Sequence, residues 1–235
     1  MRTPRWLKLL GWHFRGVLFL LTATLMAQQL PSSLTLSINS LSSARIYIAP
    51  QSPDPVERVT TDDLGSALSA SLAWRYEFAP ALLAHARVEY IGADEERLDR
   101  VGTALLTGYR AGALEAGVLF ALPFGGSSFR MLVGGGGGLY TAHRRLATAG
   151  VTAESTATIP VFDIHVLISA EYFPLRSLAV RADLLFRDPQ IPTENAYAQS
   201  SVRSNGITYP LKTEPFRSTV NLNGNVYSLG LAWYY

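Results

Sequence analysis

Hydrophobic and polar residues alternate along several stretches of the chain with the period of two that is typical of β-strands. The pattern is clearest over 67–78, ALSASLAWRYEF, where apolar and aromatic residues share one face and small or charged residues share the other. The apolar face consists of Leu68, Ala70, Leu72, Trp74, Tyr76 and Phe78. The same alternation predicts further strands over 82–90, 161–173, 178–187 and 226–235.

The number of strands depends on less regular segments. Three of these lie over about 101–109, 113–122 and 129–141, and with them the sequence predicts eight strands between 67 and 235. Two long polar segments, 142–159 and 188–224, are expected to be loops. In an outer-membrane barrel, short turns at one end alternate with longer loops at the other end. The short FAP turn falls at the end where long loops are expected, so the predicted connections do not follow this rule. Ten strands are therefore an alternative, with the additional ones from ARIYIA at 44–49 and its surroundings.

The N-terminus has the features of a secretory signal peptide. A basic segment with Arg2, Arg5, Lys8 and Arg15 precedes the apolar run GVLFLLTATLMA, and Ala27 suits a cleavage position. The apolar run is shorter than the roughly 20 residues that a transmembrane helix needs. We interpret 1–27 as a cleaved signal peptide, 28–66 as a linker that includes the candidate strand at 44–49, and 67–235 as the folded domain.

The composition argues against several classes of function. The net charge is +2, and without the N-terminal basic residues the remainder is slightly acidic, so no nucleic-acid partner is expected. The chain has no cysteine, which excludes disulfides and thiolate metal sites, and we expect no cofactor. The glycine run at 134–138 is followed by neither a Lys-Ser/Thr pair nor a helical pattern, so it is not a phosphate-binding loop. We interpret it as a strand with little side-chain bulk.

The alternation fits two kinds of barrel with opposite sidedness. In a soluble barrel the apolar face lines the interior, whereas in a membrane barrel it faces lipid and the lumen is polar. Strands of about ten residues, aromatic residues near strand ends and charges on the opposite face favour the membrane barrel. The barrel must be closed, because an open edge in lipid leaves backbone groups unpaired. We therefore predict an all-β fold, a transmembrane antiparallel up-and-down β-barrel.

The chain resembles the small outer-membrane β-barrel proteins of Gram-negative-type bacteria, the OmpA, OmpX and OmpW kind. The resemblance rests on the signal peptide, the alternating segments over 67–235 and the last strand, which ends in LGLAWYY. In that family a terminal aromatic residue with apolar residues at alternate positions before it resembles a signal for the barrel-insertion machinery. The pattern maps here onto Leu229, Leu231, Trp233 and Tyr235, with Tyr at the last position in place of the more usual Phe.

This resemblance implies a location in the bacterial outer membrane. Outer-membrane lipids and the barrel-insertion machinery are the implied partners, and the sequence does not identify an extracellular partner. We expect no wall-binding domain of the OmpA kind after Tyr235.

Charged residues of the predicted strands fall on the face that lines the lumen. The interior of an eight-stranded barrel is just wide enough to be filled by side chains, so we expect a network of ion pairs and not a pore. The predicted network consists of Arg75, Glu77, Arg87, Glu89, Asp163, His165, Glu171, Arg181 and Asp183, and the same face carries His85, Glu115 and Arg187.

Three functions follow from this pattern. The leading hypothesis is a structural or surface-interaction role, with the loops 142–159 and 188–224 outside the cell. The alternative is a narrow channel for small or hydrophobic solutes, as in the OmpW kind. A lipid-modifying enzyme is the third hypothesis, because His165, Ser169 and Glu171 share a face. His165 and Ser169 are about 13 Å apart along an extended strand, too far for a hydrogen bond, so we do not expect an enzyme.

Overall fold

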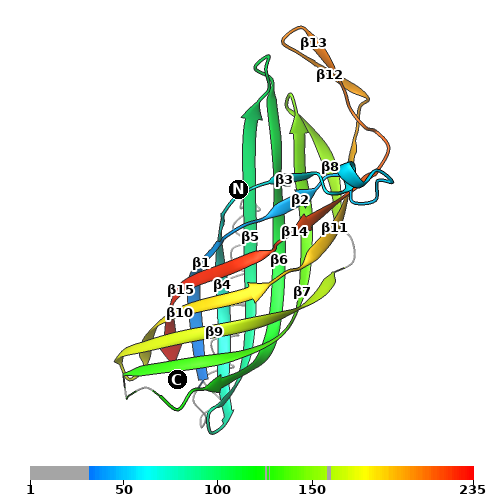
Figure 1. Ribbon diagram of the computed structural model, residues 1–235. Coiled ribbons are helices and arrows are strands. Elements are labelled where there is room, and N and C mark those ends of the chain that lie inside the picture. The colour runs from blue at the N-terminus through cyan, green and yellow to red at the C-terminus, as the bar shows by residue number, and fades with distance from the viewer. Residues whose placement is uncertain (1–31, 125, 127, 158–159) are drawn as a thin grey trace, which may run out of the picture. The chain divides into compact units, whose positions relative to one another are not determined.

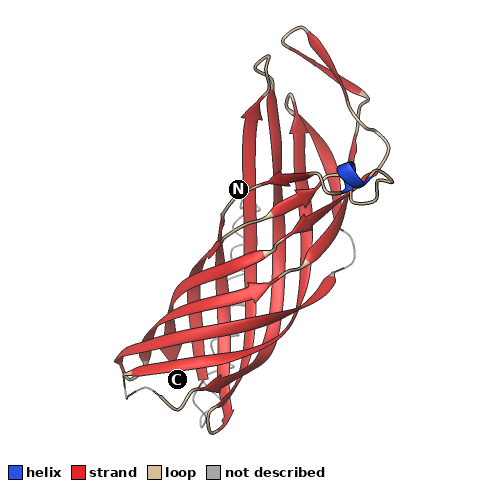
Figure 2. Ribbon diagram, in the orientation of Figure 1, coloured by secondary structure: helices blue, strands red, loops and turns tan. Residues whose placement is uncertain are grey.

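The computed structural model describes residues 32–235 except 125, 127, 158 and 159. Residues Ser32–Tyr235 belong to one compact unit (Figure 1). Strands make up most of it (Figure 2), and the one helix in the described part is the single turn α2, Pro55–Arg58. No helix in the described part is long and apolar enough to cross a membrane. The predicted signal peptide, 1–27, lies outside the described residues.

Eight antiparallel strands close into a barrel, as predicted. In order around the wall they are β1 (Ser32–Leu41), β4 (Ala67–Ala79), β5 (Leu82–Leu98), β6 (Ala104–Ala121), β7 (Phe129–Thr148), β9 (Val161–Leu175), β10 (Leu178–Arg187) and β15 (Gly224–Tyr234). Strand β1 closes the ring, since Leu36 lies opposite Leu72 on β4 and Leu231 on β15. The backbone N–H of Tyr235 also donates to the carbonyl of Ser32 over 3.0 Å.

Two of the sequence predictions are wrong, and their errors cancel in the strand count. Residues 32–41 belong to the barrel wall and not to a linker, because the apolar residues within 34–38 point outward and the small polar residues that alternate with them point inward. The predicted strands at 101–109 and 113–122 form parts of one strand, β6, which pairs continuously with β5 and β7. The domain therefore begins before residue 67.

The candidate strand at 44–49 does not add to the barrel either. It corresponds to β2 (Arg45–Tyr47), which pairs with β3 (Thr61–Asp63) and β14 (Phe216–Asn221) and not with any strand of the ring. The ten-stranded alternative is therefore wrong. These corrections also remove the irregular alternation of the connections, because the three at the end that holds the C-terminus, 80–81, 122–128 and 176–177, are now all short.

We call the end with the C-terminus the inner end and the opposite end the outer end. The outer end carries the long connections 42–66 and 188–223 and the tall hairpins β5–β6 and β7–β8 (Figure 1). Beyond the ring, β7 pairs with β8 (Val151–Ala157), which is followed by β11 (Gln190–Tyr197), β14, β2 and β3. This outer sheet stays open, since β3 has no second strand neighbour within the described residues.

A separate hairpin covers the tip of β5–β6. It consists of β12 (Ser201–Ser204) and β13 (Ile207–Pro210). The Tyr209 hydroxyl oxygen lies 3.0 Å from Thr103 Oγ1, and Asn205 Nδ2 donates to the carbonyl of Val101 over 3.0 Å. These bonds attach the hairpin to the connection 99–103.

The barrel wall is apolar on its outside and polar on its inside, as the membrane interpretation predicts. The exposed side chains of the wall include Leu36, Leu72, Val88, Leu114, Leu139, Ile164, Leu229 and Leu231, with the aromatic residues Trp74, Tyr90, Tyr172, Tyr227 and Trp233. Charged residues of the same strands are buried inside. The soluble alternative, which requires an apolar interior and a charged exterior, is contradicted by this sidedness.

A charge on the outside of β1 tests whether β1 belongs to the barrel wall and whether the outside of the wall faces lipid. Leu36 is 67% exposed between β4 and β15, where a lipid-facing arginine is expected to cost about 2–4 kcal/mol. We expect Leu36→Arg to lower the free energy of unfolding from lipid vesicles by that amount in a urea titration. Val56→Arg is the matched control, because Val56 is 72% exposed on α2 outside the barrel. Equal stability of the two variants would contradict a lipid-facing position for Leu36.

Candidate functional site

The lumen near the inner end is organised around the carboxylate of Glu171 on β9. Its Oε1 lies 2.9 Å from Arg75 Nη1 and 2.7 Å from Arg181 Nη2. Its Oε2 lies 2.7 Å from Arg130 Nη2 and accepts the Tyr234 hydroxyl over 2.7 Å. Three guanidinium groups from β4, β7 and β10 therefore share one carboxylate, and the cluster joins four strands with the C-terminal strand.

Further acids and hydroxyls complete this inner cluster. Asp183 Oδ1 lies 3.2 Å from Arg75 Nη2, and Glu77 Oε2 lies 3.4 Å from Arg130 Nη1. Ser169 Oγ accepts from Arg75 over 2.9 Å, and Ser33 Oγ and Thr35 Oγ1 on β1 accept from Arg181. Because the arginines gain several acceptors each, the cost of burying their charge is offset locally.

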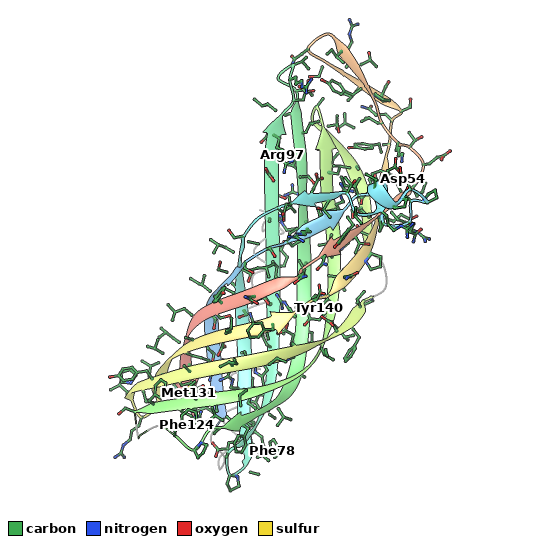
Figure 3. The ribbon with its side chains drawn as sticks, in the orientation of Figure 1. Asp54, Phe78, Arg97, Phe124, Met131 and Tyr140 are labelled. Carbon is green, nitrogen blue, oxygen red and sulfur yellow. The ribbon has the colours of Figure 1, made fainter. Side chains whose placement is uncertain are left out.

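A second cluster lies closer to the outer end and is built on two carboxylates. Arg187 Nη1 on β10 lies 2.8 Å from Glu89 Oε2 and 2.6 Å from Glu115 Oε1. Arg87 Nη2 lies 3.2 Å from Glu89 Oε2, and the Tyr140 hydroxyl donates to Glu115 over 2.9 Å. Figure 3 shows Tyr140 in the middle part of the barrel, with Phe78 and Phe124 at the inner end.

The glycine run of β7 makes room for this second cluster. A Cβ atom on Gly138 would lie 2.8 Å from the Tyr140 hydroxyl oxygen and 3.0 Å from Glu115 Cγ. A Cβ atom on Gly136 would collide with the carbonyl oxygen of Ala116 on the neighbouring strand. The interpretation of 134–138 as a strand with little side-chain bulk agrees with these contacts.

Two histidines lie between the clusters. The His85 and His165 rings meet edge to face with centroids 6.5 Å apart, and both side chains are buried. Their ring nitrogens have no hydrogen-bond partner within the described part of the chain. Buried polar atoms of this kind are usually bonded to ordered water.

Apolar side chains fill the barrel above the second cluster. Leu41, Ile91, Tyr109 and Val226 are completely or almost completely buried, and they belong to one apolar cluster with residues of β2 and β14. We call these four residues, together with Ile46 on β2 and Val220 on β14, the apolar layer. It packs the outer part of the barrel against β2 and β14 of the outer sheet.

A cleft of about 820 Å³ lies beyond the apolar layer, within the outer sheet. Its walls come from β5, β6 and β7 on one side and from the segments around β2–β3, β11 and 212–217 on the other. Its lining includes Arg144, which is 3% exposed, and its rim includes Arg97 at the outer end of β5 (Figure 3). This cleft was not predicted from the sequence.

The structure brings most of the predicted network together. Arg75, Glu77, Glu171, Arg181 and Asp183 meet in the inner cluster. Arg87 and Glu89 meet in the second cluster with Glu115 and Arg187 from the same predicted face.

Two members of the predicted network have other contacts. Asp163 accepts the backbone N–H of Asp188 over 2.9 Å, and the described ion pairs do not include it. His165 packs against His85. The enzymatic arrangement is not assembled, since Ser169 is bonded to Arg75 and Glu171 to three arginines.

Several functional side chains were missed. Tyr234 was detectable from its sequence position, because alternation from Trp233 places it on the lumen face. Arg130 and Tyr140 flank the glycine run, where alternation cannot be read, and Arg144 lies in a segment that was interpreted as a loop.

The four proposed residues of the assembly signal all lie on the outside of the wall. Leu229, Leu231, Trp233 and Tyr235 are exposed and project away from the lumen residues of β15. Their role in barrel insertion stays a prediction.

Comparisons with known proteins support the fold. No family model matches the chain, and no curated protein matches it at a significant level. Among solved structures, OprG from Pseudomonas aeruginosa is similar with a TM-score of 0.59 and 13% identity, over 87% of this chain and 95% of OprG.

Two further outer-membrane proteins give lower scores. Ail of Yersinia pestis has a TM-score of 0.47 and 11% identity, over 88% of this chain and 100% of Ail. The protease OmpT from Escherichia coli has a TM-score of 0.45 and 9% identity, over 89% of this chain and 98% of OmpT. These two scores are too low to support an argument, and the likeness to OprG concerns the fold alone. The chain thus has the fold of the small outer-membrane β-barrel proteins.

Removing the Glu171 charge tests the inner cluster. Glu171→Gln leaves three guanidinium groups around a neutral amide in a fully buried position, so we expect a loss of about 3–5 kcal/mol in the free energy of unfolding. The measurement is a urea titration in lipid vesicles followed by tryptophan fluorescence. Glu154→Gln is the control, since Glu154 is exposed on β8 and takes part in no ion pair in the described part of the chain. A loss no greater than that of the control would show that the cluster does not stabilise the barrel.

Acidification tests the attachment of the outer hairpin. The Tyr209 hydroxyl and the backbone N–H of Thr103 donate to Asp99 and lower the pKa of its carboxyl below the ordinary 3.8. A lowered folded-state pKa means that the stabilisation is present above pH 3.8 and is lost as the pH falls through the folded pKa. In an NMR titration of the Asp99 carboxyl we expect Tyr209→Phe to raise this pKa toward 3.8. An unchanged pKa in the variant would exclude the contact in solution.

Proposed function

We propose that this chain is an integral protein of the bacterial outer membrane with a structural or surface-interaction role. In this proposal the barrel anchors the outer sheet, and the sheet and its loops meet the outside of the cell. The observation that carries the proposal is the sidedness of the closed wall, apolar outside and charged inside. Only a lipid environment makes this arrangement favourable, because the exposed apolar side chains would otherwise contact water.

A closed lumen supports this role over that of a channel. The Glu171 cluster, the Glu89–Glu115 cluster and the apolar layer follow one another along the barrel. The central side chains of all three are almost completely inaccessible to water. A continuous aqueous path would require these ion pairs to separate.

The proposal includes two sets of partners. The exposed apolar belt would contact outer-membrane lipids. The alternating residues Leu229, Leu231, Trp233 and Tyr235 would be available to the barrel-insertion machinery, because they project outward from the terminal strand. Export would proceed through the predicted cleaved signal peptide, 1–27.

Membrane fractionation with gel electrophoresis tests the location and the closed barrel. We expect the full-length gene product in the outer-membrane fraction, with a band that migrates differently before and after boiling in SDS. The shift is expected because a closed barrel keeps its backbone hydrogen bonds in detergent until it is heated. A soluble product without a shift would refute the proposal.

Planar-bilayer recording tests the closed lumen. We expect no steady single-channel conductance from the wild-type protein. A triple variant, Arg75→Ser, Glu171→Ser and Arg181→Ser, removes the largest side chains of the inner cluster and serves as a more open comparison. Its barrel is verified by the heat-dependent shift before recording. Steady conductance of the wild-type protein would overturn the closed lumen in favour of the narrow channel.

A further inference from the structure

The outer cleft contains a buried cation whose hydrogen-bonding capacity is largely unused. Arg144 on β7 is 3% exposed, and its nearest acid is Asp62, with 3.8 Å between Nη2 and Oδ2. Its Nε and Nη1 have no hydrogen-bond partner in the part of the chain that the structure describes. A buried guanidinium is unfavourable unless its donors are paired, so this position favours an additional acceptor.

The remaining charges of the cleft favour an acceptor that is itself negative. The lining contains four cationic residues and two acids: Arg97, Arg144, Lys212 and Arg217 against Asp62 and Glu194. Arg97 is already paired with Glu95 over 2.7 Å. The described structure shows no carboxylate closer to Arg144 than Asp62, which sits at the edge strand β3.

Most of the remaining lining is apolar or aromatic, and four uncharged polar residues complete it: Gln51, Ser52, Thr107 and Thr148. Tyr197 and Phe216 stack with ring centroids 6.4 Å apart, and Leu105 and Leu146 border the same space. Lys212 lies over the Phe216 ring, 5.9 Å from its centroid. A volume of about 820 Å³ lies within the range of small-molecule sites, and apolar walls with a few placed polar groups are typical of them.

We propose that this cleft binds a small anionic solute with an apolar body, whose negative group pairs with Arg144. The apolar body contacts Leu105, Leu146, Tyr197 and Phe216. The ligand stays at the outer end, because the apolar layer closes the barrel below it. The site deepens the proposed surface role and rests on it only for the statement that the cleft faces the outside of the cell.

Two probes that have the same apolar body and differ in charge measure how much the negative group of the ligand contributes to binding. The protein in nanodiscs of zwitterionic lipid is titrated by calorimetry with 4-phenylbutyrate and with its neutral amide, 4-phenylbutyramide. We expect the carboxylate to bind at least tenfold more tightly than the amide. Arg144→Gln should remove this preference, and Asp62→Asn should strengthen carboxylate binding because it removes the competing acid. Arg203→Gln on the outer hairpin is the matched control and should change neither affinity.

Each other result overturns the inference. Equal affinity for the two probes, no binding at millimolar concentration, or an unchanged preference in Arg144→Gln would show that Arg144 does not bind the anion. If Arg144→Gln fails to fold, Arg144→Lys decides: weaker carboxylate binding supports the site and unchanged binding refutes it. Competition by phosphatidylglycerol in the nanodiscs would assign the cleft to a lipid and refute the solute.

The two proposals fail in different ways. The heat-dependent shift verifies the barrel of every variant independently of ligand binding. A barrel that shifts but lacks the carboxylate preference refutes the cleft inference and leaves the proposed membrane role intact.

Discussion

Closure of the sheet is the constraint on which the rest of this structure depends. In lipid, every backbone N–H and C=O of the wall must find its partner within the protein. Strand β1 forms the last two sets of backbone hydrogen bonds, to β4 and to β15. Without β1, the edges of both of these strands would be open. A ring of eight strands in turn fixes an interior that side chains fill. The paired charges are therefore a consequence of closure, since polar and charged residues of the lumen must form hydrogen bonds and ion pairs with one another.

This constraint ends where the wall leaves the membrane. Above the apolar layer the ring is no longer maintained, and the sheet continues through β8, β11, β14 and β2 to the free edge of β3. Backbone groups at that edge can bond to water, so an open sheet costs little there. The same opening gives the outer region a cleft, whereas the lower barrel is packed. One continuous sheet is thus closed where it contacts lipid and open where it contacts water.

The sequence predicted the sidedness and most of the charged network because both follow from alternation alone. Arg75, Glu171 and Arg181 could be placed in the lumen since their strands have apolar neighbours on the opposite face. Strand β1 was missed even though Leu34, Leu36 and Ile38 alternate with polar residues. Serine-rich composition outweighed the periodicity, because its lumen side carries small residues where the other strands carry charges.

Partner assignments could not be predicted in the same way. They depend on the stagger of the strands, which brings Arg130 on β7 and Tyr234 on β15 to one carboxylate although 104 residues separate them. The long hairpins could not be predicted either. Strands β5 and β7 continue beyond the membrane with polar and charged residues on both faces, so their outer halves have the composition of loops.

The buried arginines of the lumen and of the outer cleft differ in how well their charge is paired. This difference identifies a position where stability alone does not explain the sequence. The four buried arginines of the lumen, Arg75, Arg87, Arg181 and Arg187, each lie within 3.2 Å of a carboxylate oxygen. Arg144 is buried to a similar degree, but the nearest acid among the described residues, Asp62, lies at 3.8 Å on an edge strand. Apolar residues of similar size would satisfy packing at this position without an unpaired charge. A residue that departs from the local pattern in this way is more readily explained by a ligand than by the fold.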